Sequence, residues 1–160
     1  MREPRYLISP RFAAGVYCLG ILLPAGRTAA APQWDQLPPD LRQKTQAFHR
    51  DFQDRDTAKV LRYLVPTFRA DLNGTRYSSR DQAAKDLPQY FDTSPDLKLT
   101  IDTLTVLSRG TARFVVRFGG NIRYVKDVPP DIGTVDETWV KSDSGGWMLS
   151  EIVFRVAGSK

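Results

Sequence analysis

The sequence predicts an α+β fold, in which about three N-terminal helices pack on a strongly curved, mostly antiparallel sheet that forms a cone. Apolar residues recur at helical spacing between positions 40 and 91, whereas the alternation typical of strands dominates after Pro95. Helices that precede a run of strands indicate segregated layers. A slip in the alternation after Ile101 and the pair Gly119-Gly120 predict a bulge and a bend that curl the sheet.

The first 31 residues have the pattern of a cleavable secretory signal. A basic start is followed by an apolar run over residues 12–24 and by small residues up to Ala31. An uncleaved membrane anchor is the alternative, but the run is short against the roughly 20 apolar residues that span a bilayer. Lipid attachment at Cys18 is a second alternative, which Tyr17 and the position of Cys18 inside the run disfavour. We therefore expect a secreted or periplasmic protein with no stable membrane anchor after cleavage.

Most of the net charge belongs to this leader. The whole chain has 23 Lys and Arg against 18 Asp and Glu, and removing residues 1–31 leaves 19 against 17. A nearly balanced surface gives no reason to expect nucleic acid or anionic lipid as a partner. The remaining chain has no cysteine, which excludes disulfides and cysteine metal sites there. We predict no cofactor and no metal.

The helical part divides into three segments. Residues 32–39 contain three prolines and are interpreted as a flexible lead-in, and residues 40–158 as a single domain. The first helix is expected to begin with a capping box formed by Asp40 and Gln43. The second is expected to start at Asp54 or Asp56 and to stop at Pro66.

Ser79 and Gln82 repeat the capping-box spacing and predict the start of the third helix, which Pro88 should kink or shorten. Asn73-Gly74 lies between the second and third helices and predicts the turn of a small hairpin, since both residues tolerate positive φ.

Strands are expected over most of the chain beyond residue 98. Residues 112–125 read as one long strand bent at Gly119-Gly120, with a hairpin turn at the glycines as the open alternative. Residues 128–133 read as a loop, and two final strands are expected over residues 133–141 and 147–156.

Three stretches together resemble the nuclear-transport-factor-2-like superfamily, the SnoaL-like or cystatin-like α+β cones. They are DRDT at 54–57 with LVPTF at 64–68, SRDQA at 79–83 before Tyr90-Phe91, and TWVK at 138–141 with GGWML at 145–149. The resemblance implies a cone that opens to one side and a homodimer formed through the open sheet face. It also implies a range of functions, because the superfamily contains isomerases, dehydratases, epoxide hydrolases and cyclases as well as non-enzymatic binding and dimerisation domains.

No catalytic set of that superfamily carries over to this sequence. The steroid isomerases use a tyrosine from the first helix, and residues 40–53 have none. The dehydratases place histidines on strands, and the predicted strands have none. The epoxide hydrolases use an Asp-Arg-Asp relay on strands, whereas Asp54-Arg55-Asp56 lies between helices.

Two residues are candidates for acid–base chemistry. Glu137 shares a strand face with Val135 and Trp139, and on an inward face its carboxylate would suit a general acid or base. The alternatives are an outward face or a pairing with Arg117 or Arg123. His49, the only histidine, could face the mouth of the cone, although a solvated position on the helix is the favoured interpretation.

The candidate ligand pocket comprises His49, Tyr63, Tyr77, Tyr90 and Trp139, although aromatic residues in a small domain are more often core. The expected function is non-enzymatic: binding of a small, mainly apolar ligand in the cone, or pairing with itself or a partner. The alternative is a cofactor-free lyase, isomerase or cyclase that works through Glu137.

Overall fold

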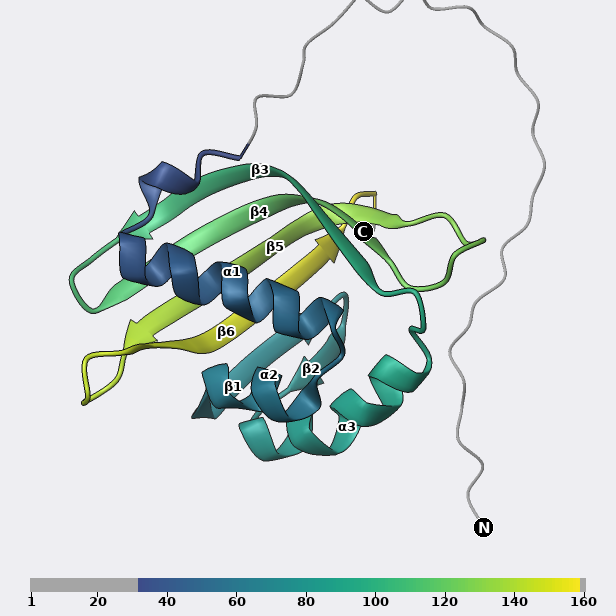
Figure 1. Ribbon diagram of the computed structural model, residues 1–160, viewed down its shortest axis with the longest axis horizontal. Coiled ribbons are helices and arrows are strands. Elements are labelled where there is room, and N and C mark those ends of the chain that lie inside the picture. The colour runs from purple at the N-terminus through teal and green to yellow at the C-terminus, as the bar shows by residue number, and fades with distance from the viewer. Residues whose placement is uncertain (1–31, 159–160) are drawn as a thin grey trace, which may run out of the picture.

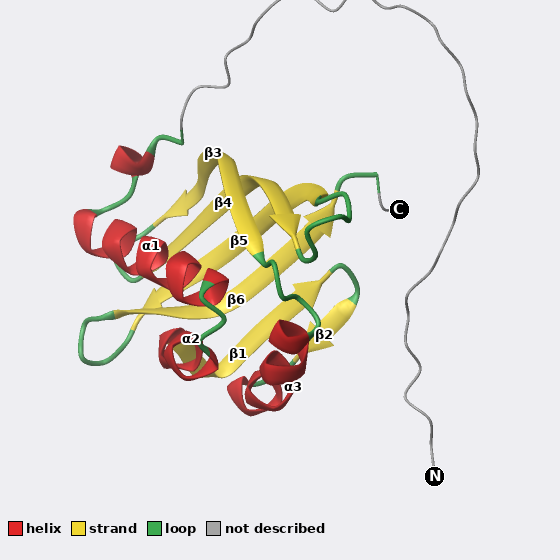
Figure 2. Ribbon diagram, turned by 45° about the vertical axis from the view of Figure 1, so that its right-hand side comes forward, coloured by secondary structure: helices red, strands yellow, loops and turns green. Residues whose placement is uncertain are grey.

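The computed structural model describes residues 32–158, and the predicted signal peptide over residues 1–31 lies outside the described residues. Six strands form one sheet in the order β2-β1-β6-β5-β4-β3, in which β1 and β6 are parallel and all other neighbours antiparallel. Figures 1 and 2 show α1 lying across the hollow face of the sheet, while α2 and α3 lie beside β1 and β2. This arrangement confirms the predicted α+β fold with helices on a curved sheet.

The elements follow the predicted order. They are the 3₁₀ helix η1 (Trp34–Gln36), α1 (Pro39–Gln53), α2 (Thr57–Tyr63), β1 (Leu64–Leu72), β2 (Thr75–Tyr77), α3 (Arg80–Asp92), β3 (Lys98–Arg109), β4 (Arg113–Arg123), β5 (Asp131–Lys141) and β6 (Trp147–Val156). Among the described residues, no helix is long and apolar enough to cross a membrane.

The start of α1 differs from the prediction. The helix begins at Pro39, and its N-cap, Pro38, provides no side-chain hydrogen bond. Asp40 does not close a capping box, because its Oδ2 accepts hydrogen bonds from Lys141 Nζ and Trp147 Nε1, each at 2.9 Å. Asp40 therefore ties α1 to the last hairpin instead of capping the helix.

The second helix is shorter than predicted. It is capped by Asp56, whose carboxylate accepts a hydrogen bond from Lys59 N, and it ends at Tyr63. Leu64 and Pro66 already belong to β1. Pro66 is tolerated there because the pairing of β1 with β6 is interrupted between Leu64 and Arg69, so no ladder donor is missing.

The later local predictions hold more closely. Ser79 caps α3 by accepting from Gln82 N, and the helix continues through Pro88 to Asp92. Asn73 and Gly74 both have positive φ in the turn between β1 and β2. β4 runs through its glycines as one strand, which excludes the alternative of a hairpin turn there.

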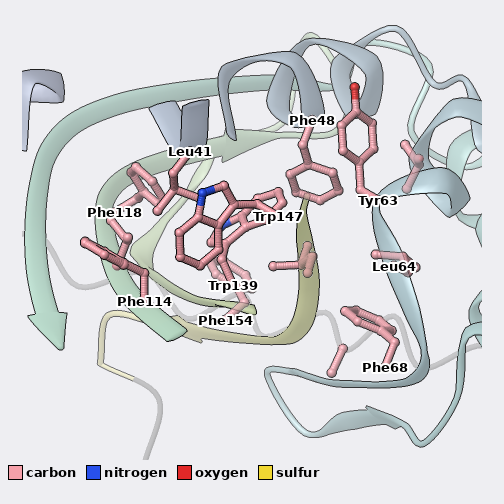
Figure 3. Packing of buried hydrophobic residues seen from close by; sticks show 14 of the residues in the cluster. Leu41, Phe48, Tyr63, Leu64, Phe68, Phe114, Phe118, Trp139, Trp147 and Phe154 are labelled. Atoms are coloured by element: carbon pink, nitrogen blue, oxygen red, sulfur yellow. The ribbon is translucent and has the colours of Figure 1, made fainter. Parts of the chain in front are cut away.

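Most of the fully buried side chains come from α1 and strands β4–β6. Figure 3 shows Phe48 of α1 beside Trp139, with Leu41 and Phe118 near by. Trp139 and Leu41 are fully buried, and the rings of Phe48 and Trp139 meet edge to face at 6.0 Å. The lead-in also packs on the domain, since Leu37 is buried, so this segment is not the loose extension that its prolines suggested.

Candidate functional site

The cone keeps an open cavity of about 420 Å³ beside this core. Its wall is formed by α1, α2, α3 and all six strands, and most of it is apolar. The aliphatic and phenylalanine residues of the wall are Phe48, Phe52, Val60, Leu64, Phe68, Ala70, Leu72, Ala83, Leu87, Leu99, Ile101, Phe118, Ile122, Val135, Ile152 and Phe154. Polar side chains occur at separate places on it, which gives the cavity distinct chemical regions.

Strand β5 runs through the cavity and connects these regions. Alternate residues of a strand share one face, and Asp131, Gly133, Val135 and Glu137 all line the cavity. Six residues of extended strand span on the order of 20 Å, so Asp131 and Glu137 mark two well-separated regions of the wall.

Glycines allow the sheet to curl around this space. Gly120 of β4 and Gly133 of β5 are opposite each other in the register. A Cβ atom on Gly120 would lie 1.9 Å from the carbonyl oxygen of Thr100, and one on Gly133 would lie 2.1 Å from that of Arg155. Only glycine permits such close backbone approach, so these two positions set the local curvature.

Glu137 and His49 form a buried pair in the cavity wall. His49 Nε2 lies 2.6 Å from Glu137 Oε1, and Trp139 Nε1 donates to Glu137 Oε2 at 2.8 Å. Glu137 is 1% exposed and His49 is 8% exposed. Both carboxylate oxygens therefore have partners, and the pair connects α1 to β5 across 88 positions of sequence.

The imidazole of His49 is enclosed by aromatic rings. Phe118 meets it edge to face at 4.9 Å between ring centroids, Phe48 lies at 5.7 Å, and Trp34 of η1 lies at 6.2 Å. Its second nitrogen, Nδ1, is buried and has no hydrogen-bond partner among residues 32–158. The site thus holds an oriented imidazole whose free nitrogen is shielded from solvent.

A second polar region of the wall contains three tyrosines and Asp131. Tyr77 of β2, Tyr90 of α3 and Tyr124 just after β4 all line the cavity together with Asp131. The Tyr90 and Tyr124 rings are nearly perpendicular, with centroids 6.1 Å apart. Burial above all, and then the negative charge of Asp131, raises the pKa of Tyr124 to about 12. Burial likewise raises the pKa of Tyr90 and that of Tyr77.

Two of the predicted pocket residues do not reach the cavity. Trp139 is enclosed in the core, where its indole donates to Glu137. The Tyr63 hydroxyl donates to Asp51 Oδ2 at 2.6 Å, outside the cavity lining. Burial and this hydrogen bond raise the pKa of Tyr63 to about 12. The other three predicted pocket residues, His49, Tyr77 and Tyr90, belong to the wall.

The alternatives considered for His49 and Glu137 also differ from the structure. His49 is not a solvated helix residue, since it is buried against Glu137. Arg117 does not pair with Glu137, because it forms a two-pronged ion pair with Asp136 at 2.6 and 2.7 Å. Sequence reasoning did not assign Asp131 to the site, although its alternation with Val135 and Glu137 was a usable signal.

No group of three or more His, Cys, Asp or Glu side chains within residues 32–158 is placed to hold a metal ion.

Comparison with known proteins supports the fold but identifies no function. The sequence matches no protein-family profile. No curated protein matches it. Solved structures with the same architecture include nuclear transport factor 2 from Cryptosporidium parvum, at 18% identity and a TM-score of 0.64, covering 79% of this chain and 96% of that one. At identities this low, the structural likeness establishes only a shared cone-shaped α+β fold.

Two further neighbours carry provisional enzyme names. A provisionally assigned ketosteroid isomerase from Shewanella frigidimarina has a TM-score of 0.63 at 14% identity, covering 79% of this chain and all of that one. A provisionally assigned scytalone dehydratase from Novosphingobium aromaticivorans has a TM-score of 0.64 at 15% identity, covering 74% of this chain and 82% of that one. An uncharacterised protein with a cystatin-like fold from Caulobacter vibrioides is equally similar, with a TM-score of 0.65.

Proposed function

We propose that this protein binds a small, mainly apolar molecule inside the cone. The observation that carries the proposal is the open cavity of about 420 Å³, which remains although many aromatic side chains surround it. Ligand pockets are commonly about 300–1,000 Å³, mostly apolar, with a few placed polar groups. A cone filled by its own side chains would instead have favoured a pure interaction module.

The polar groups of the wall fit a binding role better than a catalytic one. Glu137 is covered, and both of its oxygens are already occupied by His49 and Trp139. A general base must come within hydrogen-bond reach of the proton that it removes, and the Glu137 carboxylate is 1% exposed with a protein partner already on each oxygen. Its main contribution is to hold His49 and α1 in place.

A saturable fluorescence titration with the neutral probe N-phenyl-1-naphthylamine tests the proposal. Val135 lines the cavity, whereas Val115 of β4 faces away from it between the buried residues Phe114 and Val116. We expect wild type and the matched control Val115→Trp to bind the probe with a stoichiometry near one. Val135→Trp should fill the cavity and abolish binding, while an unchanged far-ultraviolet circular dichroism spectrum shows that the variant is folded. Equal binding by both variants, or no saturation in wild type, would contradict a ligand cavity.

A second function is favoured by one observation, the unpartnered Nδ1 of His49. An imidazole whose Nε2 is held by a carboxylate presents the lone pair of Nδ1 as a base, the arrangement used to activate nucleophiles and remove protons. Movement of an aromatic neighbour such as Trp34 would be needed to admit a substrate. The names of the isomerase and dehydratase neighbours are compatible with this chemistry.

Hydrogen–deuterium exchange at the α-carbon of an enolisable cyclic ketone, followed by NMR in deuterated water, tests the acid–base alternative. Catalysed exchange that is lost in His49→Gln but kept in Val115→Trp would support it. Exchange at the uncatalysed rate in wild type leaves the binding function as the better account.

Export and assembly are part of the same proposal. The secretory signal predicted over residues 1–31 supports a secreted or periplasmic protein, and the resemblance supports a homodimer formed through the open sheet face. Native mass spectrometry of protein exported by a bacterial host would report processed mass, oligomer and any retained ligand together. A monomer that keeps residues 1–31 would refute both.

A further inference from the structure

The formally charged side chains of the cavity wall are all acidic. It includes two carboxylates, Asp131 and Glu137, and neither lysine nor arginine, although basic residues outnumber acidic ones in the whole chain. The Glu137 carboxylate is committed to His49 and Trp139. Asp131 has no ion-pair partner among the Lys and Arg side chains of residues 32–158. One carboxylate therefore faces the cavity without a cation to neutralise it.

Two tyrosines from separate elements lie close enough to this carboxylate for its charge to act on their hydroxyl groups, Tyr124 most strongly and Tyr90 less so. Tyr124 follows β4 directly and Tyr90 comes from α3, with their rings nearly perpendicular at 6.1 Å. Phe52 of α1 lies 6.0 Å from Tyr90, and Tyr77 of β2 lines the same cavity. Aromatic rings that converge beside a carboxylate are the usual surroundings of a bound ammonium group, because ring faces and the anion both attract positive charge.

We propose that the ligand is an amphiphilic amine, whose ammonium group lies beside Asp131 among Tyr77, Tyr90 and Tyr124 while its apolar body extends along β5 toward Glu137. This inference rests on the proposed ligand-binding function and specifies its ligand class. An anionic head group at the same place would meet the like charge of Asp131, with no lysine or arginine in the cavity wall to pair with. A neutral head group would leave the attraction of the carboxylate unused.

The cavity also selects the shape of the ligand. The inward residues of β5 from Asp131 to Glu137 span on the order of 20 Å, and the wall between them is formed largely by aliphatic and phenylalanine side chains. A single chain of about ten carbon atoms places its charged end at Asp131 and its tail in this apolar region without reaching the buried pair at Glu137. Decyl compounds are therefore suitable probes.

Isothermal titration calorimetry with three decyl probes tests the proposal, with the two ionic probes kept below their critical micelle concentrations and 1-decanol below its solubility limit. Decyltrimethylammonium, 1-decanol and decyl sulfate share the tail and differ in head-group charge. We expect the ammonium compound to bind about tenfold more tightly than decanol, and the sulfate to bind most weakly. Asp131→Asn should remove most of this preference, measured as the ratio of the ammonium affinity to the decanol affinity of the same variant. The matched control Asp143→Asn, in the exposed turn between β5 and β6, makes the same change of net charge and should keep the preference.

The outcomes separate this inference from the function on which it rests. If decanol binds and the ammonium compound has no advantage, or if Asp131→Asn and Asp143→Asn behave alike, the amine is wrong and the apolar cavity stands. If the sulfate binds best, the charge argument is wrong. If none of the three probes binds to wild type while Val135→Trp and wild type give the same calorimetric trace, the ligand-binding function itself is wrong.

Discussion

At the scale of single residues, two glycines determine whether the cavity can exist. Gly120 and Gly133 sit opposite each other on neighbouring strands, and each lies against the backbone of the next strand. A backbone carbonyl cannot swing aside as a flexible side chain can. The curvature of the sheet, and with it the hollow that the helices cover, therefore depends on the absence of two Cβ atoms.

Gly133→Ala should destabilise the fold for this reason. Its Cβ would lie 2.1 Å from the carbonyl oxygen of Arg155, which forces β5 and β6 apart. Overpacking of this kind costs typically about 1–3 kcal/mol in the free energy of unfolding, measured by urea denaturation. Gly146→Ala is the matched control, since its Cβ would have as its nearest neighbour the Ser142 hydroxyl at 3.8 Å. Equal stability of the two variants would show that the sheet relaxes without cost.

The pair formed by His49 and Glu137 shows what a sequence can predict about single residues and what it cannot. Alternation along residues 131–139 was enough to place Glu137 on the face of Val135 and Trp139, and that placement is correct. Nothing in the local sequence states which side of α1 meets that face. The contact depends on the rotation of α1, which Leu41, Thr45 and Phe48 set jointly by being buried.

At the scale of elements, the position of α1 over the sheet is fixed by polar contacts along its length. Asp40 accepts from Lys141 and Trp147 near the start of α1. His49 meets Glu137 in the last third of the helix, and Gln53 Oε1 accepts from Leu99 N at its end, at 3.0 Å. The hydrophobic effect is non-directional, whereas hydrogen bonds have defined geometry and so add direction to the packing. These contacts give the helix one register over the cavity.

A double-mutant cycle on the pair measures this cross-link. His49→Phe alone and Glu137→Leu alone each leave a buried polar partner unsatisfied, and each should lower the free energy of unfolding by about 3 kcal/mol. The double variant removes both groups, so its cost should fall well below the sum of the single costs. The exposed pair Asp56–Lys59, 3.0 Å apart, is the control cycle and should give a coupling below about 1 kcal/mol. Additive costs at His49 and Glu137 would mean that the contact contributes no specificity.

Elements with their own local signals were predicted well, and those decided by distant contacts were not. The Ser79 cap and the Asn73-Gly74 turn depend on neighbouring residues only, and both are confirmed. The start of α1 and the end of α2 were misplaced. Asp40 is held by Lys141, about 100 positions away, and Leu64 pairs with Leu149 of β6, so sheet pairing overrode the helical spacing.

At the scale of the whole molecule, the burial of tyrosines makes the free energy of unfolding fall at alkaline pH. Tyr63 and Tyr124 each have a pKa of about 12 in the folded protein, mainly because burial disfavours the phenolate. Tyrosine in an unfolded chain ionises near pH 10. Between these values the native state retains protons that the unfolded state loses. The stabilising contribution is therefore complete below about pH 10 and is lost as the pH rises through about 12.

Replacing Tyr124 by phenylalanine should flatten this decline. Phenylalanine keeps the ring and removes the ionisable group. Above about pH 10, the free energy of unfolding should therefore fall less steeply for Tyr124→Phe than for wild type. Urea denaturation from about pH 9 to about pH 12, with phenolate absorbance recorded in parallel, measures both the stability and the ionisation. The absorbance of the native protein should rise later than that of the urea-unfolded chain. A difference between wild type and variant that stays constant over this range would show that Tyr124 ionises freely, and that the tyrosine-lined region of the cavity is open to water.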